Sequence, residues 1–316
     1  MKNPATLASI LGVCAWECAN FDSAFAQAAL PYAEVYQRMT NEFARAEYYK
    51  PAESRTNEPS FTLAPLIMQQ VRATGAPPSM PDRFGAVSVS NGVVAFDPSH
   101  PSIYWACDTV QIKAATLARF SYVWCYPPSP EVAPAGRRPG DGVPGEGGAA
   151  LPLQGIRTTL NSAGQPLIWE VLAEGTGAKL FFVSQHLEAA AMAEFGQPLP
   201  GRRYSVERSL EAAPDVIVAR VLDDSPVPAG PIVYLDAVTR SVGTLTCRCM
   251  PAQARKLVAT TVYDLRPFDL LPSSSILTNA GSALRDVAAS WPGGAADGKR
   301  LEACLRLPDA IFSIRK

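Results

Sequence analysis

Side chains suited to acid–base chemistry lie near the middle of the chain. His186 is one of two histidines in the sequence, and Ser184 precedes it by two residues. An imidazole can activate a nearby hydroxyl by taking its proton. Together with Glu170 and Arg157, His186 therefore forms a candidate catalytic group. The alternative for His186 is a partly exposed place in the first turn of a helix, without a chemical role.

Glu170 and Arg157 are expected on two strands joined by a short turn. Glu170 shares a strand face with apolar residues, so we expect its carboxylate to be half buried. A buried carboxylate requires a partner. Pairing Ile156 with Trp169 across the hairpin places Arg157 diagonal to Glu170, close enough to provide that partner. The alternative to a catalytic role is a structural ion pair.

Other motifs argue against cofactors. Residues 140–145 match the dinucleotide pattern G-x-G-x-x-G, but they lie in a Gly/Pro-rich tract that cannot open a helix after a strand. His186 and Glu188 form the H-x-E half of a zinc deaminase site, which also needs C-x-x-C, whereas Cys247 and Cys249 form only C-x-C. The sequence therefore predicts no cofactor and no metal.

Two acidic residues also occur next to prolines. Asp223 and Asp224 precede Pro226 and Pro228, a pattern typical of a solvated turn. We therefore expect no functional role for this pair.

The amino terminus has the layout of a secretory signal. Lys2 is followed by an apolar stretch over Ala5–Trp16 and by an A-x-A cleavage site over Ala24–Ala26. Residues 1–26 are therefore predicted to be a signal, which places the protein in the periplasm or outside the cell. The alternative is a buried amino-terminal helix.

The cysteines are consistent with export. Of seven in the chain, two would leave with the signal; the five that remain are disulfide candidates, namely Cys107, Cys125, Cys247, Cys249 and Cys304. If the hairpin over residues 102–126 turns at Thr116, Cys107 faces Cys125 and the two can form a disulfide; the alternative is two buried thiols. Cys247 and Cys249 share a strand face, and one of them could bond Cys304.

Charge and hydropathy exclude two classes of protein. The 28 basic and 29 acidic residues give a net charge of −1, which argues against binding nucleic acid, for which an excess of basic residues is expected. Apolar runs stay below the roughly 18 residues of a membrane span. We therefore expect no nucleic-acid partner and no integral membrane span.

The mature chain divides into four regions by composition. Residues 27–82 are predicted to form a helix over Tyr32–Tyr49 followed by a Pro-rich extended arm. Residues 83–126 read as a first β region, with a hairpin around the Asn91-Gly92 pair. Residues 127–154 form a Pro/Gly-rich linker or a loop insertion. Residues 155–316 read as an α+β region that shares one core with 83–126.

The expected fold is α+β, with a mainly antiparallel sheet built from hairpins and a few packed helices. The helices are predicted at His186–Phe195, Ala252–Ala259 and Thr278–Ser290. Gly196 follows the first of these as a left-handed cap.

Two functional hypotheses follow. The first is an exported, non-enzymatic binding or structural protein with a protein or small-molecule partner. The alternative is an exported hydrolase or transferase with its active site near His186, Glu170 and Arg157. A third possibility is a cytoplasmic protein with a buried amino-terminal helix and all its thiols reduced.

Overall fold

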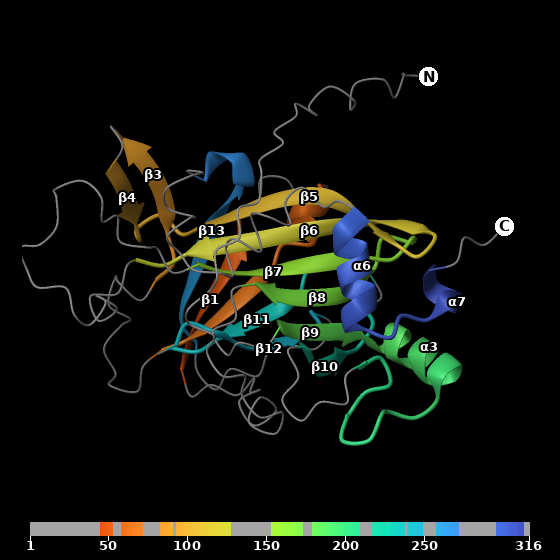
Figure 1. Ribbon diagram of the computed structural model, residues 1–316. Helices are drawn as coiled ribbons and strands as arrows, with labels where there is room; N and C mark the ends of the chain where they lie inside the picture. Colours follow the sequence, from red (N-terminus) through yellow and green to blue (C-terminus); the bar gives the residue numbers. More distant parts are fainter. Residues whose placement is uncertain are drawn as a thin grey trace, which may run out of the picture.

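The structure is a computed structural model, and most of its elements are strands (Figure 1). It describes residues 45–52, 58–71, 83–90, 93–127, 153–172, 179–208, 216–225, 227–237, 239–248, 257–271 and 295–312. Eleven strands form one mixed sheet that curls until its two outermost strands, β10 and β12, come into contact, so that the barrel is nearly closed. In order across the sheet the strands are β10 (Val216–Leu222), β9 (Lys179–Ser184), β8 (Pro166–Leu172), β7 (Leu153–Leu160), β6 (Ala115–Cys125), β5 (Ser102–Ile112), β13 (Leu257–Pro267), β1 (Ala46–Pro51), β2 (Leu66–Gln70), β11 (Ile232–Leu235) and β12 (Val242–Thr246).

The predicted α+β fold with a mainly antiparallel sheet of hairpins is wrong. Strands β5 to β9 do form an antiparallel meander of hairpin neighbours. However, four pairs of neighbours are parallel: β1 with β13, β13 with β5, β11 with β2, and β10 with β9. Parallel neighbours cannot be joined by a tight turn. They come from segments far apart in the chain, which local patterns do not pair.

Two segments predicted to be non-strand supply these parallel pairs. Ala46–Pro51, at the end of the predicted helix, is strand β1, and Leu66–Gln70, within the predicted extended arm, is strand β2. The helix predicted over Ala252–Ala259 is likewise wrong at its end, because β13 begins at Leu257. The preference of Tyr, Ile and Val for a pleated sheet outweighs the helical spacing once neighbouring strands are present.

Aromatic and aliphatic side chains fill the inside of the barrel. Tyr122, Trp124, Ile156 and Phe182 are fully buried in this inner core. Burial of each such side chain contributes roughly 1.5–3 kcal/mol. The short helix α2 (Pro59–Thr62) and the residues after it are held against this core, because the Tyr122 hydroxyl donates to the Ser60 carbonyl at 2.8 Å.

Three helices cover part of the outer face of the sheet: α3 (Gln185–Phe195), α6 (Ala295–Cys304) and α7 (Asp309–Phe312), as Figure 1 shows. They bury a second apolar cluster that includes Ile168, Leu187 and Leu301. Gly298 lets α6 lie directly on β5, since a Cβ there would be 1.5 Å from the Gln111 carbonyl oxygen. Among the described residues, a short 3-10 turn over Phe268–Leu270 follows β13.

The hairpin between β5 and β6 turns earlier than predicted, and this overturns a disulfide. Cys107 pairs with Phe120, not with Cys125, because Gln111 and Thr116 still pair within the ladder. Phe120 and Cys125 lie five positions apart on one strand, so Cys107 and Cys125 belong to opposite faces of the sheet. Cys107 and Cys125 are free thiols, so the predicted Cys107–Cys125 bond is wrong. Cys247 is disulfide-bonded, but Cys304 is not in a disulfide, so the predicted bond between Cys304 and Cys247 or Cys249 is wrong as well. Cys249 lies outside the described residues.

Helix α3 lies within one residue of the predicted range His186–Phe195. The helix begins at Gln185, where the Ser184 hydroxyl accepts a hydrogen bond from the Leu187 N–H at 3.1 Å. It ends at Gly196, whose φ of 79° is the left-handed conformation that glycine adopts freely.

A separate hairpin of β3 (Ala86–Ser90) and β4 (Val93–Asp97) lies at one end of the sheet and confirms two predicted strands. The predicted signal, the helix predicted at Thr278–Ser290 and nearly all of the Pro/Gly-rich segment 127–154 lie outside the described residues. Strands β6 and β7, on either side of that segment, are hydrogen-bonded neighbours. Among the described helices, none is both long and apolar enough to cross a membrane.

Candidate ligand-binding site

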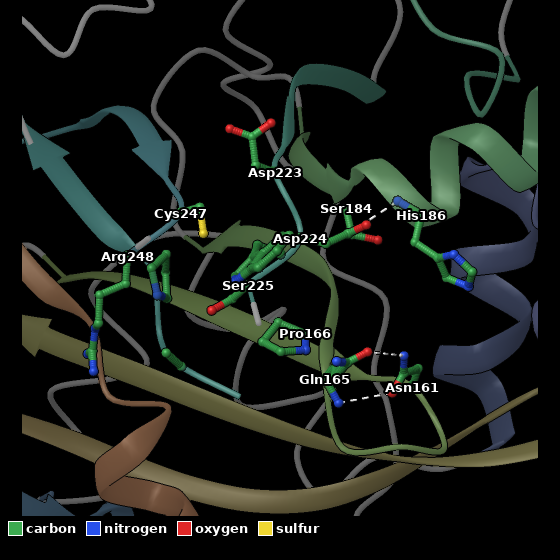
Figure 2. A pocket seen from close by; sticks show the side chains of 13 residues that line it. Asn161, Gln165, Pro166, Ser184, His186, Asp223, Asp224, Ser225, Cys247 and Arg248 are labelled. Carbon is green, nitrogen blue, oxygen red and sulfur yellow. Dashed lines mark hydrogen bonds between the residues drawn. The ribbon is translucent and has the colours of Figure 1, made fainter. Parts of the chain in front are cut away.

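A polar hollow lies where the barrel nearly closes (Figure 2). Its wall is formed by the turn between β7 and β8, by the carboxyl ends of β9, β10 and β12, and by the first turn of α3. Its enclosed volume is small, about 20 Å³, and it widens into a surrounding space of about 450 Å³ that includes open solvent. We call it the polar hollow; the residues used below are Asn161, Gln165, Trp169, Ser184, His186, Asp223, Asp224, Ser225 and Arg248.

Local hydrogen bonds fix the wall of the polar hollow. The Asn161 Oδ1 atom accepts hydrogen bonds from the backbone N–H groups of Ala163 and Gln165, both at 2.9 Å, which shapes the β7–β8 turn. On the other side, Asp224 Oδ1 accepts from the backbone N–H of His186 at 3.2 Å. This contact ties the segment after β10 to the free amino end of α3, where a carboxylate is favourable.

Exposed and buried residues with polar groups line the polar hollow together. Asp223 and Asp224 are exposed, as is His186, whereas Trp169 is only 5% exposed. The indole Nε1–H of Trp169 is buried and has no hydrogen-bond partner. Leaving a buried donor unsatisfied costs about 1–3 kcal/mol. A ligand that accepts a hydrogen bond from Trp169 would recover this energy.

Arg248 adds a positive charge from the end of β12. Its guanidinium donates to the Ala64 carbonyl at 2.7 Å and to the Thr62 carbonyl at 3.4 Å, which links the polar hollow to α2. Burial lowers the pKa of Arg248, because the charged form loses hydration. Its Nε atom is buried without a partner. Both carboxylates and a guanidinium therefore line the same space.

His186 and Ser184 do not form a nucleophile–base pair. The Ser184 hydroxyl caps α3, and Figure 2 shows the imidazole of His186 directed away from it. A serine nucleophile requires its base within hydrogen-bonding distance. His186 is exposed in the first turn of a helix, which was the alternative predicted for it.

Glu170 and Arg157 are brought together, but away from the polar hollow. They pair directly across β7 and β8, two positions from the register expected, with Arg157 Nη1 3.8 Å from Glu170 Oε2. Arg300 of α6 completes the group, with its Nη2 2.5 Å from Glu170 Oε1. We call these three residues the ion-pair cluster.

The ion-pair cluster is enclosed between the sheet and α6. Glu170 is 5% exposed and Arg157 is 2% exposed. Burial alone would raise the pKa of Glu170, but the guanidinium groups of Arg157 and Arg300 outweigh it and lower this pKa. A lowered pKa makes this carboxylate a weaker proton acceptor than an ordinary glutamate.

Alternation along β8 places Glu170 on the face of the sheet opposite to the polar hollow. Trp169 lines the polar hollow and belongs to the inner core, so its neighbour Glu170 lies on the opposite face of the sheet. Glu170 and Arg157 therefore lie together, and neither lines the polar hollow to which His186 belongs. The sequence could have shown this, because adjacent residues of a strand point to opposite faces.

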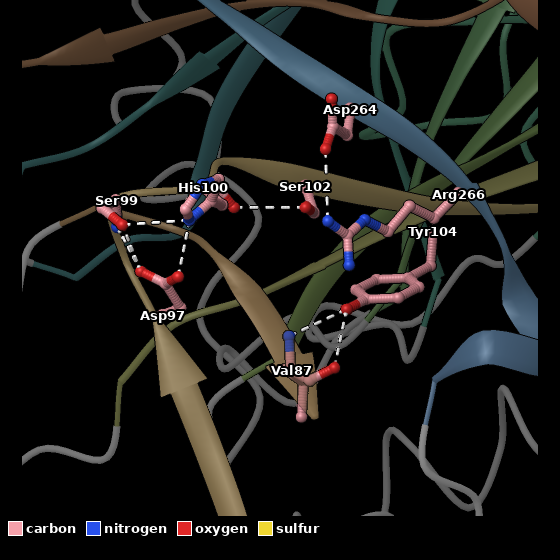
Figure 3. Close-up of polar contacts among 8 residues, drawn as sticks. All are labelled: Val87, Asp97, Ser99, His100, Ser102, Tyr104, Asp264 and Arg266. Atoms are coloured by element: carbon pink, nitrogen blue, oxygen red, sulfur yellow. Dashed lines mark hydrogen bonds and ion pairs between the residues drawn. The ribbon is translucent and has the colours of Figure 1, made fainter. Parts of the chain in front are cut away.

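The second histidine lies in a cluster after β4 (Figure 3). The imidazole Nδ1 of His100 is 2.6 Å from an Asp97 carboxylate oxygen and 3.0 Å from the Ser99 hydroxyl. In a catalytic triad the serine and the carboxylate use different ring nitrogens, whereas here both contact Nδ1. Hydrogen bonds from Ser99 and then from His100 lower the pKa of Asp97 to about 2. The arrangement is that of a hydrogen-bonded surface turn.

Sequence reasoning missed Asp223, Asp224 and Arg248 as members of a site. The two aspartates were expected only in a solvated turn, and they are indeed exposed. Nothing in their spacing relates them to Arg248, which reaches the polar hollow from a different strand. Within the described ranges there is no group of three or more His, Cys, Asp or Glu residues that could hold a metal ion.

Comparison of the chain with protein families, with curated proteins and with solved structures finds no match. The functional argument therefore depends on the geometry of the polar hollow.

Proposed function

We propose that this is an exported, non-enzymatic binding protein and that the polar hollow is its ligand site. The observation that carries the proposal is the buried, unpartnered N–H of Trp169 in a hollow that also presents exposed carboxylates. Binding sites are concave and place a few convergent polar groups around the ligand. The polar hollow has these properties, and its side chains come from separate segments of the fold.

The charges favour a small zwitterionic ligand of the amino-acid type. Asp223 and Asp224 suit an ammonium group, because both are exposed at the mouth. Trp169 Nε1 and Arg248 Nε are buried donors that suit a carboxylate or carbonyl oxygen. A purely anionic ligand would be repelled by the aspartates, and a purely cationic ligand would leave the two donors unsatisfied.

Calorimetric titration of the full chain with single L-amino acids tests this proposal. Putrescine and acetate serve as probes that carry only one kind of charge. We expect at least one amino acid to bind more tightly than either of them, and we expect mass spectrometry to recover that amino acid unchanged. Chemical conversion of the bound probe would instead favour the predicted hydrolase or transferase.

Variants link the binding to the polar hollow. Removing both charges with Asp223→Asn and Asp224→Asn should weaken binding by roughly 10-fold or more, because hydrogen bonds to charged groups contribute about 1.5–3 kcal/mol. Lys179→Gln, at the exposed start of β9, is the matched control and should leave the affinity unchanged. Equal affinity in the double variant, or no binding by any amino acid, would refute the proposed site.

Export is a separate part of the proposal and depends on residues 1–26. Its test is the intact mass of the protein purified from its native host. Loss of residues 1–26 would support export, and a full-length chain would exclude a cleaved signal.

A further inference from the structure

A second hollow lies on the outer face of the barrel, away from the polar hollow. It has a volume of about 400 Å³. It is bounded by the β5–β6 turn, the end of α3, Arg208 and the junction between α6 and α7. Its lining shares no residue with the polar hollow. We call it the basic hollow, because three of its lining residues are cationic, Lys113, Arg208 and Arg306, and only Glu302 is acidic.

The carboxylate of Glu302 already accepts a hydrogen bond from another residue of the basic hollow. Its Oε1 atom accepts a hydrogen bond from the backbone N–H of Lys113 at 2.6 Å. The ammonium group of Lys113 reaches Asp309 at 2.5 Å and also donates to the Leu307 carbonyl. Lys113 thus ties the β5–β6 turn to α7, and its positive charge is partly compensated.

Arg208 and Arg306 retain more of their hydrogen-bond donors and positive charge for a ligand. Arg208 is exposed and donates one hydrogen bond, to the Glu302 carbonyl. No carboxylate within salt-bridge distance is found for Arg208 or Arg306 among the described residues. A guanidinium offers five donors, so both side chains can bind an additional acceptor.

Arg306 is the most informative residue. Its guanidinium lies over the ring of Phe195, 4.7 Å from the ring centroid, and its Nη2 donates to the Phe195 carbonyl at 2.9 Å. These contacts fix its orientation. Its Nη1, in contrast, is buried and has no acceptor. A charged donor held in place without a protein acceptor calls for a water or an ion to supply one.

We propose that the basic hollow binds a small oxyanion of the phosphate type, with Arg306 and Arg208 as its direct donors. Guanidinium groups form paired hydrogen bonds to phosphate oxygens. Lys113 adds to the positive potential from across the hollow. Because Asp309 pairs with Lys113, the charge available to a ligand comes mainly from Arg208 and Arg306, and two guanidinium groups match a dianion.

Titration calorimetry with inorganic phosphate at low ionic strength tests this proposal on the full chain. We expect saturable binding of one phosphate, and we expect sodium chloride at equal ionic strength to give no comparable signal. Arg306→Gln should weaken binding by 10-fold or more. Because Arg306 also caps α3, the exposed Arg208→Gln is the second variant, and it should weaken binding several-fold while the melting temperature stays unchanged.

Two outcomes would overturn the proposal. One is an absence of phosphate binding by the folded wild type. The other is an affinity that Arg208→Gln and Arg306→Gln leave unchanged, since binding would then occur elsewhere. Lys179→Gln serves as the control for general surface charge, and it should bind phosphate as the wild type does. Asp223→Asn and Asp224→Asn should also leave phosphate binding intact, which separates this site from the proposed function.

Discussion

The ion-pair cluster and the polar hollow both contain carboxylates and guanidinium groups, but these groups are paired with each other only in the ion-pair cluster. In the ion-pair cluster, Glu170 is buried between two guanidinium groups and covered by α6. In the polar hollow, Asp223 and Asp224 are exposed, and the buried donors of Trp169 and Arg248 are unsatisfied. Charges that satisfy each other hold a fold together, whereas groups left unsatisfied at a surface are available for a ligand. We therefore expect the first region to contribute to stability, and the second is the region proposed to bind a ligand.

The largest expected effect comes from breaking the ion-pair cluster. Arg157→Met removes one of the two guanidinium groups beside Glu170 and leaves a poorly compensated buried carboxylate. We expect it to destabilise the protein by about 3–5 kcal/mol, measured by urea unfolding. The double variant Arg157→Met/Glu170→Leu should recover much of this loss, because Arg300 is partly exposed and can reach water. A single variant as stable as the wild type would show that Glu170 does not depend on Arg157.

A smaller effect on stability is expected from replacing Glu207. This residue is buried like Glu170, but its pKa shifts in the opposite direction. Burial raises the pKa of Glu207 to about 7, although the backbone N–H groups of Tyr204, Arg203 and Val218 act against this shift. The folded state therefore holds the proton more tightly than the unfolded state. Glu207 therefore contributes to the free energy of unfolding. This contribution is fully present below about pH 4.3, the pKa of the residue in the unfolded chain, and is lost as the pH rises through about 7.

Comparison with Glu207→Gln isolates this contribution. The stability of the wild type relative to the variant should fall between about pH 4.3 and pH 7, measured by urea unfolding across that range. For Glu170 the sign is opposite: because its pKa is lowered, the advantage of the wild type over Glu170→Gln should be lost as the pH falls. Parallel trends for the two variants would contradict the assigned environments.

The smallest expected effect on stability belongs to the polar hollow. The double variant of Asp223→Asn and Asp224→Asn should change the free energy of unfolding by less than about 0.5 kcal/mol, because both side chains are exposed. The same variant is the one expected to lose ligand binding. A loss of stability as large as that of Arg157→Met would remove the distinction between the two regions.

Local sequence patterns determined much of the secondary structure. Strand β10, the helix α3 with Gly196 after its end, and the strands β3 and β4 follow the prediction closely. The proximity of Glu170 and Arg157 was also predictable. These features depend on residues close together in the chain, where alternation, helix capping and short turns specify the conformation.

Tertiary structure alone decided the barrel and both hollows. Strands β1 and β2 acquire their conformation by pairing with distant strands, and Arg300 reaches Glu170 from a helix 130 residues away. A two-residue shift in the β7–β8 register and a different turn between β5 and β6 were enough to change which side chains face each other. Sequence patterns specify which face a residue prefers within its own strand. The partner on the next strand, and therefore the site, depends on the energy of the whole packed sheet.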